Sequence, residues 1–164
     1  MYKLKDIYRI TAYSTACEVI DRLVSGSVDE RRGVIVSGFW RSGTTWLQEM
    51  LAGVLCYKTI FEPFDARVLD RHPSFLYPEN IKTSLADKKV FMPYAAGSIS
   101  RDDPLYKILA EAFKATINGS WVRRSRRSVA ESFRKGTIVK LVRGHLCLDA
   151  IAATFNIPVI HVTR

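Results

Sequence analysis

Apolar residues recur along the chain at intervals that change from helical to strand-like and back. In residues 1–30 they fall at roughly helical spacing, which predicts an amphipathic lead-in helix ending near Gly26. The positions that carry this spacing are Ile7, Ile10, Ala16 or Cys17, Ile20, Leu23 and Val24. The run from Val34 to Ser37 is apolar in the manner of a parallel strand that is covered on both faces. The chain is therefore predicted to open with a helix followed by a buried strand.

Downstream of that strand the helical spacing returns. Residues 45–57 are predicted to form a helix with a broad apolar face. That face consists of Trp46, Leu47, Met50, Leu51, Val54 and Leu55. Another helix is predicted to begin at Pro104, a residue favoured in the first turn, and to end near Asn118 and Gly119.

The C-terminal part alternates between the two kinds of element. Residues 137–142 read as a strand, 146–155 as a helix and 158–163 as a strand, which together form a βαβ unit. The order of elements predicts an α/β fold with a central parallel sheet flanked by helices. Residues 58–101 lose this periodicity and hold four of the six prolines, so we expect loops and short helices there, in a substrate-binding insertion.

The composition indicates one globular domain over residues 1–164. With 48% hydrophobic residues the chain can bury a single core. The formal charge of +9 suits a polyanionic ligand, and the same charge could serve nucleic acid. Much of this charge lies in one stretch, either a solvated face or a surface that faces a ligand: Arg123, Arg124, Arg126, Arg127, Arg134 and Lys135. No apolar run of about 18 residues and no basic-then-apolar N-terminus occurs, so neither a membrane span nor a secretory signal is expected.

A glycine-bounded loop joins the first predicted strand to the next helix. Gly38 and Gly43 allow positive φ and let the backbone approach an anion closely. The amides from Ser42 onward open a helix whose dipole favours negative charge, and the hydroxyls of Thr44 and Thr45 lie in its first turn. The pattern predicts an anion site. An ordinary turn, in which Ser and Thr only cap the helix, is the alternative.

The position of the cation in this loop distinguishes it from the loop of nucleotide triphosphatases. There, a lysine follows the second glycine and reaches the β and γ phosphates. Here Thr44 occupies that position and the cation lies three residues earlier, at Arg41. The run from Arg41 to Trp46 resembles the loop of the sulfotransferase family, which binds the sulfonate donor 3′-phosphoadenosine 5′-phosphosulfate (PAPS).

The resemblance implies a three-layer fold like that of P-loop NTPases and a role for each residue of the loop. Arg41, Ser42, Gly43, Thr44, Thr45 and Trp46 would bind the donor. Arg41 would also stabilise the charge that develops on the leaving phosphate. Trp46 would stack on the adenine, as in the cytosolic branch of the family, although a core tryptophan on the apolar helix face is an equal alternative.

The C-terminal strands carry the second part of the resemblance. Lys140 and the segment from Ile160 to Arg164 are similar to family strands that place a cation near the transferred group and bind the 3′-phosphate of the donor. By this match Arg164 would bind the 3′-phosphate. The family continues with a turn and a serine, so the resemblance implies a domain that is incomplete at its C-terminus. Family members of the Golgi carry an N-terminal anchor that this sequence does not show, so a cytoplasmic location is expected.

The base that removes the proton of the acceptor hydroxyl has two candidates. The cytosolic branch has a histidine two residues after the lysine; here Val142 stands there and His145 is the nearest histidine. Glu62 competes with it, because Phe61 to Phe64 resembles a segment of carbohydrate-directed and bacterial sulfotransferases, and a carboxylate with a raised pKa can act as a base. Structural roles are the alternatives, an ion pair or helix cap for Glu62 and a buried salt bridge for Lys140.

These observations predict a sulfotransferase that moves a sulfonate group from PAPS to a hydroxyl or amine acceptor. Its catalytic residues would be Arg41, Lys140 and either Glu62 or His145. No metal is expected, since the sequence offers no carboxylate pair suited to magnesium. The expected partner is a small-molecule or carbohydrate acceptor, and nucleic acid is not expected. A P-loop kinase or nucleotide hydrolase, or a non-catalytic domain that binds anions or nucleic acid, remains the alternative.

Overall fold

A parallel sheet forms the centre of the molecule. The structure, a computed structural model, describes residues 4–24, 30–69, 95, 97–117, 119–126 and 128–163. The strands of the sheet are β1 (Gly33–Gly38), β2 (Lys58–Phe61), β3 (Thr137–Leu141) and β4 (Val159–Val162). Their order is β2-β3-β1-β4, and every pair of neighbours is parallel. The predicted α/β fold with a parallel sheet is confirmed.

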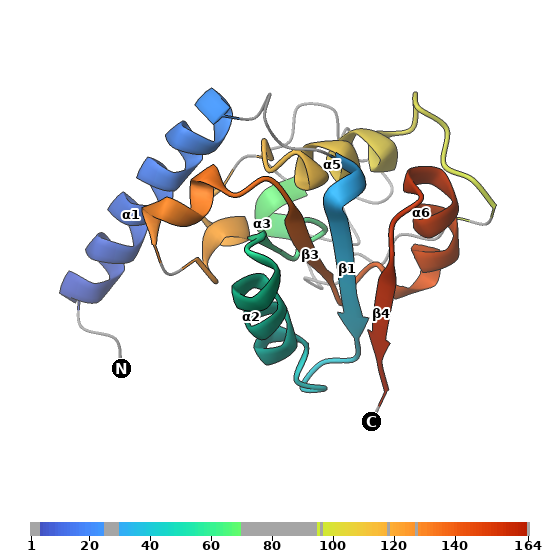
Figure 1. Cartoon of the computed structure of the whole chain (residues 1–164), viewed down its shortest axis with the longest axis horizontal. Coiled ribbons are helices and arrows are strands. Elements are labelled where there is room, and N and C mark those ends of the chain that lie inside the picture. Colours follow the sequence, from blue (N-terminus) through green and yellow to red (C-terminus); the bar gives the residue numbers. More distant parts are fainter. Residues whose placement is uncertain are drawn as a thin grey trace.

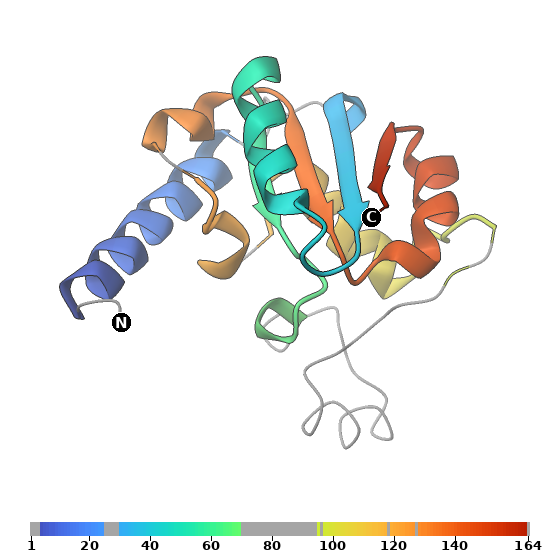
Figure 2. The same cartoon turned by 90° about the horizontal axis from the view of Figure 1, so that it is seen from below.

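Helices cover both faces of the sheet, so that apolar side chains of the central strands are buried on each side (Figures 1 and 2). Helix α2 (Thr44–Leu55) packs on one face, where Ala52 joins Val34, Val36 and Ile138 in a small core. Helices α5 (Pro104–Phe113) and α6 (Leu148–Phe155) lie on the other face over the larger core, which includes Ile35. Because β1 is buried on both faces, it needs the apolar run that the sequence shows.

The connections between strands create a topological switch point at the centre of the sheet. The chain passes from β1 through α2 to β2 on one side, and from β3 through α6 to β4 on the other, each time crossing one strand. The two connections therefore diverge from the adjacent strands β1 and β3, on opposite faces of the sheet (Figure 2). In open parallel sheets, ligands bind outside the carboxyl ends of the strands at such a switch point.

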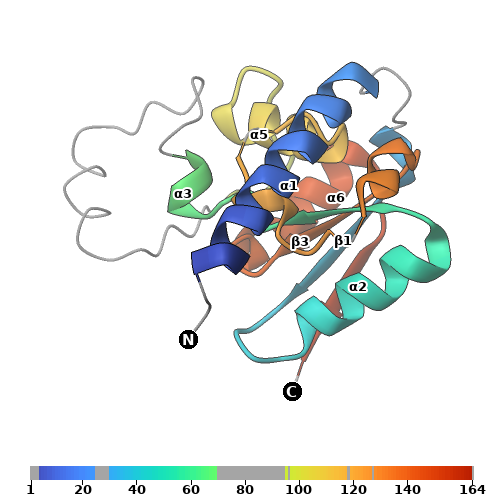
Figure 3. The same cartoon turned by 90° about the vertical axis from the view of Figure 1, so that its left-hand side faces the viewer.

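Helix α1 (Leu4–Val24) runs beside the β2 edge of the sheet, against the 3₁₀ turns η3 (Trp121–Arg123) and η4 (Val129–Phe133) (Figure 3). Asp21 of α1 is fully buried there. It accepts hydrogen bonds from Arg123 Nε and Arg126 Nη1, both at 2.9 Å, and lies 3.5 Å from Lys58 Nζ. A carboxylate surrounded by buried cations thus joins α1 to the sheet.

That cluster corrects one interpretation of the basic stretch. A solvated face was one of the alternatives, yet Arg123 and Arg126 are buried, whereas Arg124 and Lys135 are exposed. The cations alternate between interior and surface because the chain turns twice through 3₁₀ geometry at η3 and η4. Arg127 lies outside the described residues. The stretch is therefore not one continuous basic surface.

Two other predictions need correction. The segment 58–101, expected to be loops and short helices, begins with strand β2, whose residues Lys58–Phe61 are all buried; short helix α3 (Ala66–Leu69) follows, and residues 70–94 and 96 lie outside the described part. The helix that begins at Pro104 ends at Phe113, before the predicted Asn118, since Lys114 caps it and Ala115 takes φ 57°. A helix, α1, is present where the lead-in helix was predicted, but its predicted apolar face is only partly buried: Cys17 is buried, whereas Leu23 is 79% exposed. The predicted end near Gly26 falls outside the described residues.

Candidate functional site

The residues singled out by the sequence meet at the carboxyl edge of the sheet. The loop of residues 39–43, here termed the β1–α2 loop, follows β1, and Glu62 follows β2. Lys140 is the last residue but one of β3, and it pairs in register with Val36 of β1 and Phe61 of β2. Because the strands are parallel, their carboxyl ends lie at the same edge, and residues far apart in the sequence become neighbours.

The β1–α2 loop is folded tightly onto the end of β1. A side chain at Gly38 would bring its Cβ within 2.7 Å of both Ser42 Oγ and the Val162 carbonyl, so only glycine fits there. Gly43 adopts the left-handed conformation, with φ 84°, at the cap of α2. Arg41 also has positive φ, 65°, which is uncommon for a residue with a side chain. This concentration of unusual backbone is typical of ligand-binding loops.

The first turn of α2 presents unsatisfied donors at this loop. Its N-terminal cap, Gly43, offers no side chain, and no side-chain hydrogen bond caps the helix. The first amides of α2 therefore have neither an intrahelical carbonyl nor a capping oxygen. The Ser42 hydroxyl is buried and has no partner among the described residues. No Ser or Thr side chain caps the helix in the way that the alternative of an ordinary turn expects, and the uncapped donors suit an anion.

Glu62 and Lys140 form a buried pair directly beside α2. Lys140 Nζ donates to Thr45 Oγ1 at 3.0 Å and lies 3.5 Å from Glu62 Oε1. Both side chains are almost fully buried. The Val142 amide donates to both carboxylate oxygens of Glu62 at 3.3 Å. The pair thus connects the ends of β2 and β3 to the first turn of the helix that follows β1.

Burial opposes the charged form of both members of this pair. Desolvation raises the pKa of Glu62 above its usual value, against the opposing attraction of Lys140 and Arg143. Desolvation likewise lowers the pKa of Lys140, although Glu62 favours its charged form. A carboxylate with a raised pKa is a better proton acceptor than an ordinary one, and an ammonium with a lowered pKa gives up a proton more readily. Perturbed values of this kind are typical of functional sites.

A second pair of charges holds Glu62 from the other side. Arg143 Nη1 lies 3.6 Å from Glu62 Oε2 and 3.1 Å from Asp65 Oδ2. Glu62 itself has φ 46°, so its backbone is held in the left-handed region just after β2. The sequence pattern did not single out Arg143 or Asp65. The only available signal was their position a few residues beyond the strand ends that carry Lys140 and Glu62.

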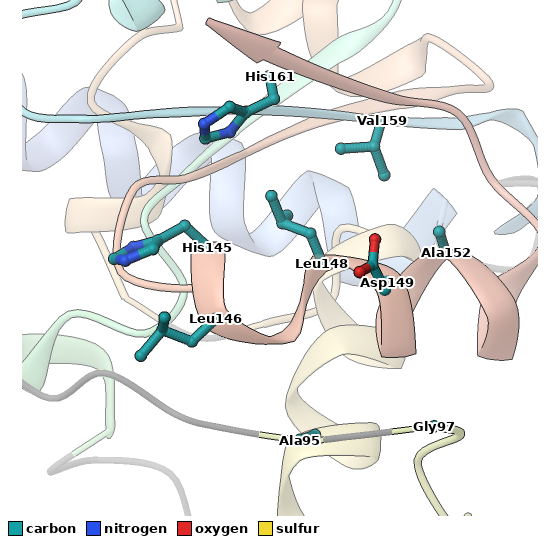
Figure 4. A pocket seen from close by; sticks show the side chains of 9 residues that line it. All are labelled: Ala95, Gly97, His145, Leu146, Leu148, Asp149, Ala152, Val159 and His161. Carbon is teal, nitrogen blue, oxygen red and sulfur yellow. The ribbon is translucent and has the colours of Figure 1, made fainter. Parts of the chain in front are cut away.

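His145 lies elsewhere along the same edge. The centre of its ring lies 5.5 Å from that of Phe39, and its Nδ1 donates to the Val142 carbonyl at 3.1 Å. Together with His161 and Asp149 it lines a cavity of about 730 Å³ between α6 and β4 (Figure 4). Within the described part of the chain, no hydrogen bond or ion pair joins His145 to Glu62 or Lys140. The two predicted bases therefore occupy different surroundings.

Trp46 is 68% exposed at the start of α2, so it is not a core residue. The predicted broad apolar face of this helix is confirmed only in part: Leu47 and Leu51 pack against the small core, whereas Met50, Val54 and Leu55 are exposed and Gln48 is buried with Ala52. Gln48 faces inward because its Nε2 donates to the carbonyls of Ile60 and Ile138, both at 2.9 Å. Arg164, the predicted 3′-phosphate ligand, lies outside the described residues.

Neither a metal centre nor a membrane-spanning helix is found in the parts of the chain that the structure describes. Their His, Cys, Asp and Glu side chains form no group of three or more that could hold a metal ion. None of their helices is long and apolar enough to cross a membrane. Comparison of the chain with protein-family models, curated proteins and solved structures returned no match.

Proposed function

We propose that this chain is a PAPS-dependent sulfotransferase domain of the P-loop type, which moves a sulfonate group to a hydroxyl of an acceptor. The observation that carries the proposal is the contact chain from Thr45 through Lys140 to Glu62. These contacts bring together the hydroxyl of Thr45, the ammonium of Lys140 and the buried carboxylate of Glu62. They lie beside a loop that carries a further cation, Arg41. Sulfonyl transfer requires such a set of groups: a loop that binds the anionic donor, a cation near the transferred group and a base.

The β1–α2 loop fits the phosphosulfate end of such a donor. The uncapped amides of α2, the unpartnered Ser42 hydroxyl and the close approach allowed by Gly38 favour an anionic, oxygen-rich group. Arg41 is exposed, and within the described residues it forms no ion pair, so its guanidinium is available for phosphate oxygens. The exposed ring of Trp46 suits stacking on a purine. PAPS supplies an activated sulfonate whose leaving group is a phosphate.

In this proposal each residue of the pair has one task. Glu62, with its raised pKa, accepts the proton of the acceptor hydroxyl as the new oxygen–sulfur bond forms. The bond between sulfur and the phosphate oxygen breaks, and its electron pair remains on that phosphate. Lys140 and Arg41 stabilise the charge that develops there. Arg143 and Asp65 hold Glu62 in place. His145, in its separate surroundings, is the less favoured base.

Thermal unfolding with different ligands tests the proposal. At a concentration of 3′-phosphoadenosine 5′-phosphate near 100 times its Kd, we expect stabilisation by about 2.7 kcal/mol. For a chain of this length that raises Tm by about 5–11 °C. The R41Q variant should lose most of this shift, whereas K135Q, which removes an equal charge from the exposed Lys135 at the other end of β3, should keep it. Transfer of labelled sulfonate to hydroxyl acceptors is the matching activity assay.

The same measurement separates the alternatives. Stronger stabilisation by ATP with Mg²⁺ would overturn the proposal in favour of a kinase or nucleotide hydrolase. Salt-sensitive binding only to a DNA oligomer would favour a nucleic-acid-binding domain. The burial of Arg123 and Arg126 weakens that last alternative, because these cations are committed to Asp21 and are not presented to a ligand.

A further inference from the structure

Aromatic rings and cations alternate in a continuous stack that starts at the buried pair and ends at the surface. Lys140 Nζ lies 4.1 Å from the ring centre of Phe61. The guanidinium of Arg124 lies 4.3 Å from the centres of both Phe61 and Trp121. The guanidinium of Arg67 lies 3.7 Å from the centre of the Trp121 ring. The rings of Phe61 and Trp121 pack edge to face. We call Phe61, Arg67, Trp121 and Arg124 the Arg–Trp stack.

The stack holds two guanidinium groups in fixed orientations at the surface. Arg124 is exposed, and the Arg67 side chain is 58% exposed. Stacking on an aromatic face leaves the edges of a guanidinium, which carry its N–H donors, directed away from the ring. Such a pre-oriented arginine loses little side-chain entropy when it binds a carboxylate or sulfate. The geometry favours recognition of planar or branched anions.

Positive charge is in excess around the stack. Among the described residues, four cations, Arg67, Arg124, Lys140 and Arg143, face two carboxylates, Glu62 and Asp65, the latter 3.6 Å from Arg67 Nε. Within the described residues Arg124 has no carboxylate partner, and burial, the main cause of the lowered pKa of Lys140, is reinforced by the nearby charge of Arg124. Because the carboxylates do not neutralise all of these cations, the site would be stabilised by an anion that binds from outside.

Unpaired hydrogen-bond donors point to the same conclusion. Trp121 Nε1 and Arg143 Nε are buried, and neither has a partner among the described residues. Both belong to the cluster that surrounds Glu62 and the stack, and both are donors only. Because buried donors are normally satisfied, an oxygen-rich ligand in this region would supply the missing acceptors.

We propose that the Arg–Trp stack selects an anionic acceptor, one that carries a carboxylate or sulfate beside the hydroxyl to be modified. This inference rests on the proposed function, because the stack adjoins Glu62, the proposed base. Arg67 and Arg124 bind the anionic group and thereby place the neighbouring hydroxyl against Glu62. They are specificity residues and take no part in the transfer of the proton or the sulfonate.

This selectivity is tested with two pairs of acceptors, one aromatic and one sugar-based; each pair consists of an anionic compound and a neutral analogue. The aromatic pair is 3-(4-hydroxyphenyl)propionate and its methyl ester; the sugar pair is phenyl β-glucuronide and phenyl β-glucoside. Binding is measured by calorimetry in the presence of 3′-phosphoadenosine 5′-phosphate, and turnover is measured with labelled donor. In at least one pair the anionic member should bind about 10–100 times more tightly than the neutral member, as expected for charge-assisted hydrogen bonds.

Variants then test whether the Arg–Trp stack causes the preference for the anionic member. In the R67Q/R124Q double variant the anionic member of each pair should bind no more tightly, and have no lower KM, than the neutral member. Turnover of the neutral member, which does not use these arginines, and the thermal shift with 3′-phosphoadenosine 5′-phosphate should be retained. The R124K variant, which keeps the charge and loses the planar stack, should be intermediate. The K135Q variant is the control for loss of charge alone, and it should keep the preference.

The outcomes are distinguishable from failure of the proposed function. Equal affinity of the neutral and anionic members in both pairs, or a preference that survives in R67Q/R124Q, would overturn the inference. Absence of stabilisation by 3′-phosphoadenosine 5′-phosphate would overturn the sulfotransferase proposal instead. In that case the calorimetric comparison is repeated without the nucleotide, and charge-selective binding that R67Q/R124Q abolishes would still support an anion-recognition surface.

Discussion

Replacing Asp21 with asparagine removes the charge that holds α1 against the rest of the fold. Asp21 is fully buried, and so are the side chains of the three cations around it, Lys58, Arg123 and Arg126. Asparagine is nearly isosteric, but it leaves these cations without a compensating negative charge in a region of low dielectric. Burial already lowers the pKa of Lys58 and of Arg123, which shows that water does little to support them.

The expected loss of stability is large. Breaking a buried ion pair by removing one partner costs about 3–5 kcal/mol, because the remaining charge stays buried. For a domain of this size such a loss lowers Tm by about 6–20 °C. The assay is equilibrium unfolding in urea and by heat, followed by circular dichroism. The matched control is D102N at the exposed Asp102, which should change stability by no more than about 0.5 kcal/mol.

A second substitution, K58M, tests whether unpaired buried cations cause the loss of stability in D21N. In the D21N background, K58M removes one of the unpaired cations, so it should recover part of the lost stability, whereas K58M alone should destabilise. A loss below about 1 kcal/mol for D21N, similar to that of a surface pair, would show that the cations are solvated and that Asp21 does not hold the helix. Purely additive effects of D21N and K58M would contradict the same account.

The other predictions concern the site. G38A should destabilise the fold by about 1–3 kcal/mol and abolish stabilisation by 3′-phosphoadenosine 5′-phosphate, since its Cβ would clash with the Val162 carbonyl at 2.7 Å; normal ligand-induced shifts in G38A would refute the tight loop. E62Q should lower turnover by about 10²–10⁴-fold. Because burial raises the pKa of Glu62 and the base must be deprotonated, wild-type activity should rise with pH through a midpoint above about 4.3, the ordinary value; an acid limb at or below that value would argue against Glu62 as the base. W46A should leave urea stability within about 0.5 kcal/mol, since the ring is exposed, yet weaken nucleotide binding by about 1–3 kcal/mol in calorimetry; unchanged affinity would remove Trp46 from the donor site.

Local patterns predicted the elements of this fold well where a strand is buried on both faces or a helix has a clear start. The run from Val34 to Ser37 became β1, and Pro104 with Asp103 begins α5, where Asp103 accepts a hydrogen bond from the Leu105 amide at 2.8 Å. Strand β2 was missed, because Lys58 and Thr59 are polar residues at positions that tertiary contacts bury. The apolar face of α2 was predicted only in part for a related reason: Leu47 and Leu51 pack inward as expected, but Gln48 is buried by its bonds to carbonyls of strands distant in sequence.

The candidate site likewise combines a loop that is visible in the local sequence with contacts that form only when distant segments meet. The β1–α2 loop is local, so its glycines, hydroxyls and helix start were visible as a pattern. In the structure Gly38 leaves no room for a side chain and Gly43 takes the left-handed conformation at the start of α2. Glu62 and Lys140 could each be suspected from a motif, but their contact depends on the pairing of β2 with β3. Nothing in the sequence suggested the Arg–Trp stack, since Arg67, Trp121 and Arg124 come from segments that only folding brings together.

By itself, then, the sequence determined the class of fold and the place of the glycine-bounded loop, because hydrophobic period and glycine placement act within a few residues of the chain. Only the tertiary structure decided which charges are buried and which are exposed. It committed Arg123 and Arg126 to Asp21 and left Arg124 exposed on an aromatic ring, although the three arginines are close neighbours in sequence. The physical reason is that the free energy of a charge depends on its desolvation and on partners supplied by distant segments, which residue order alone does not contain.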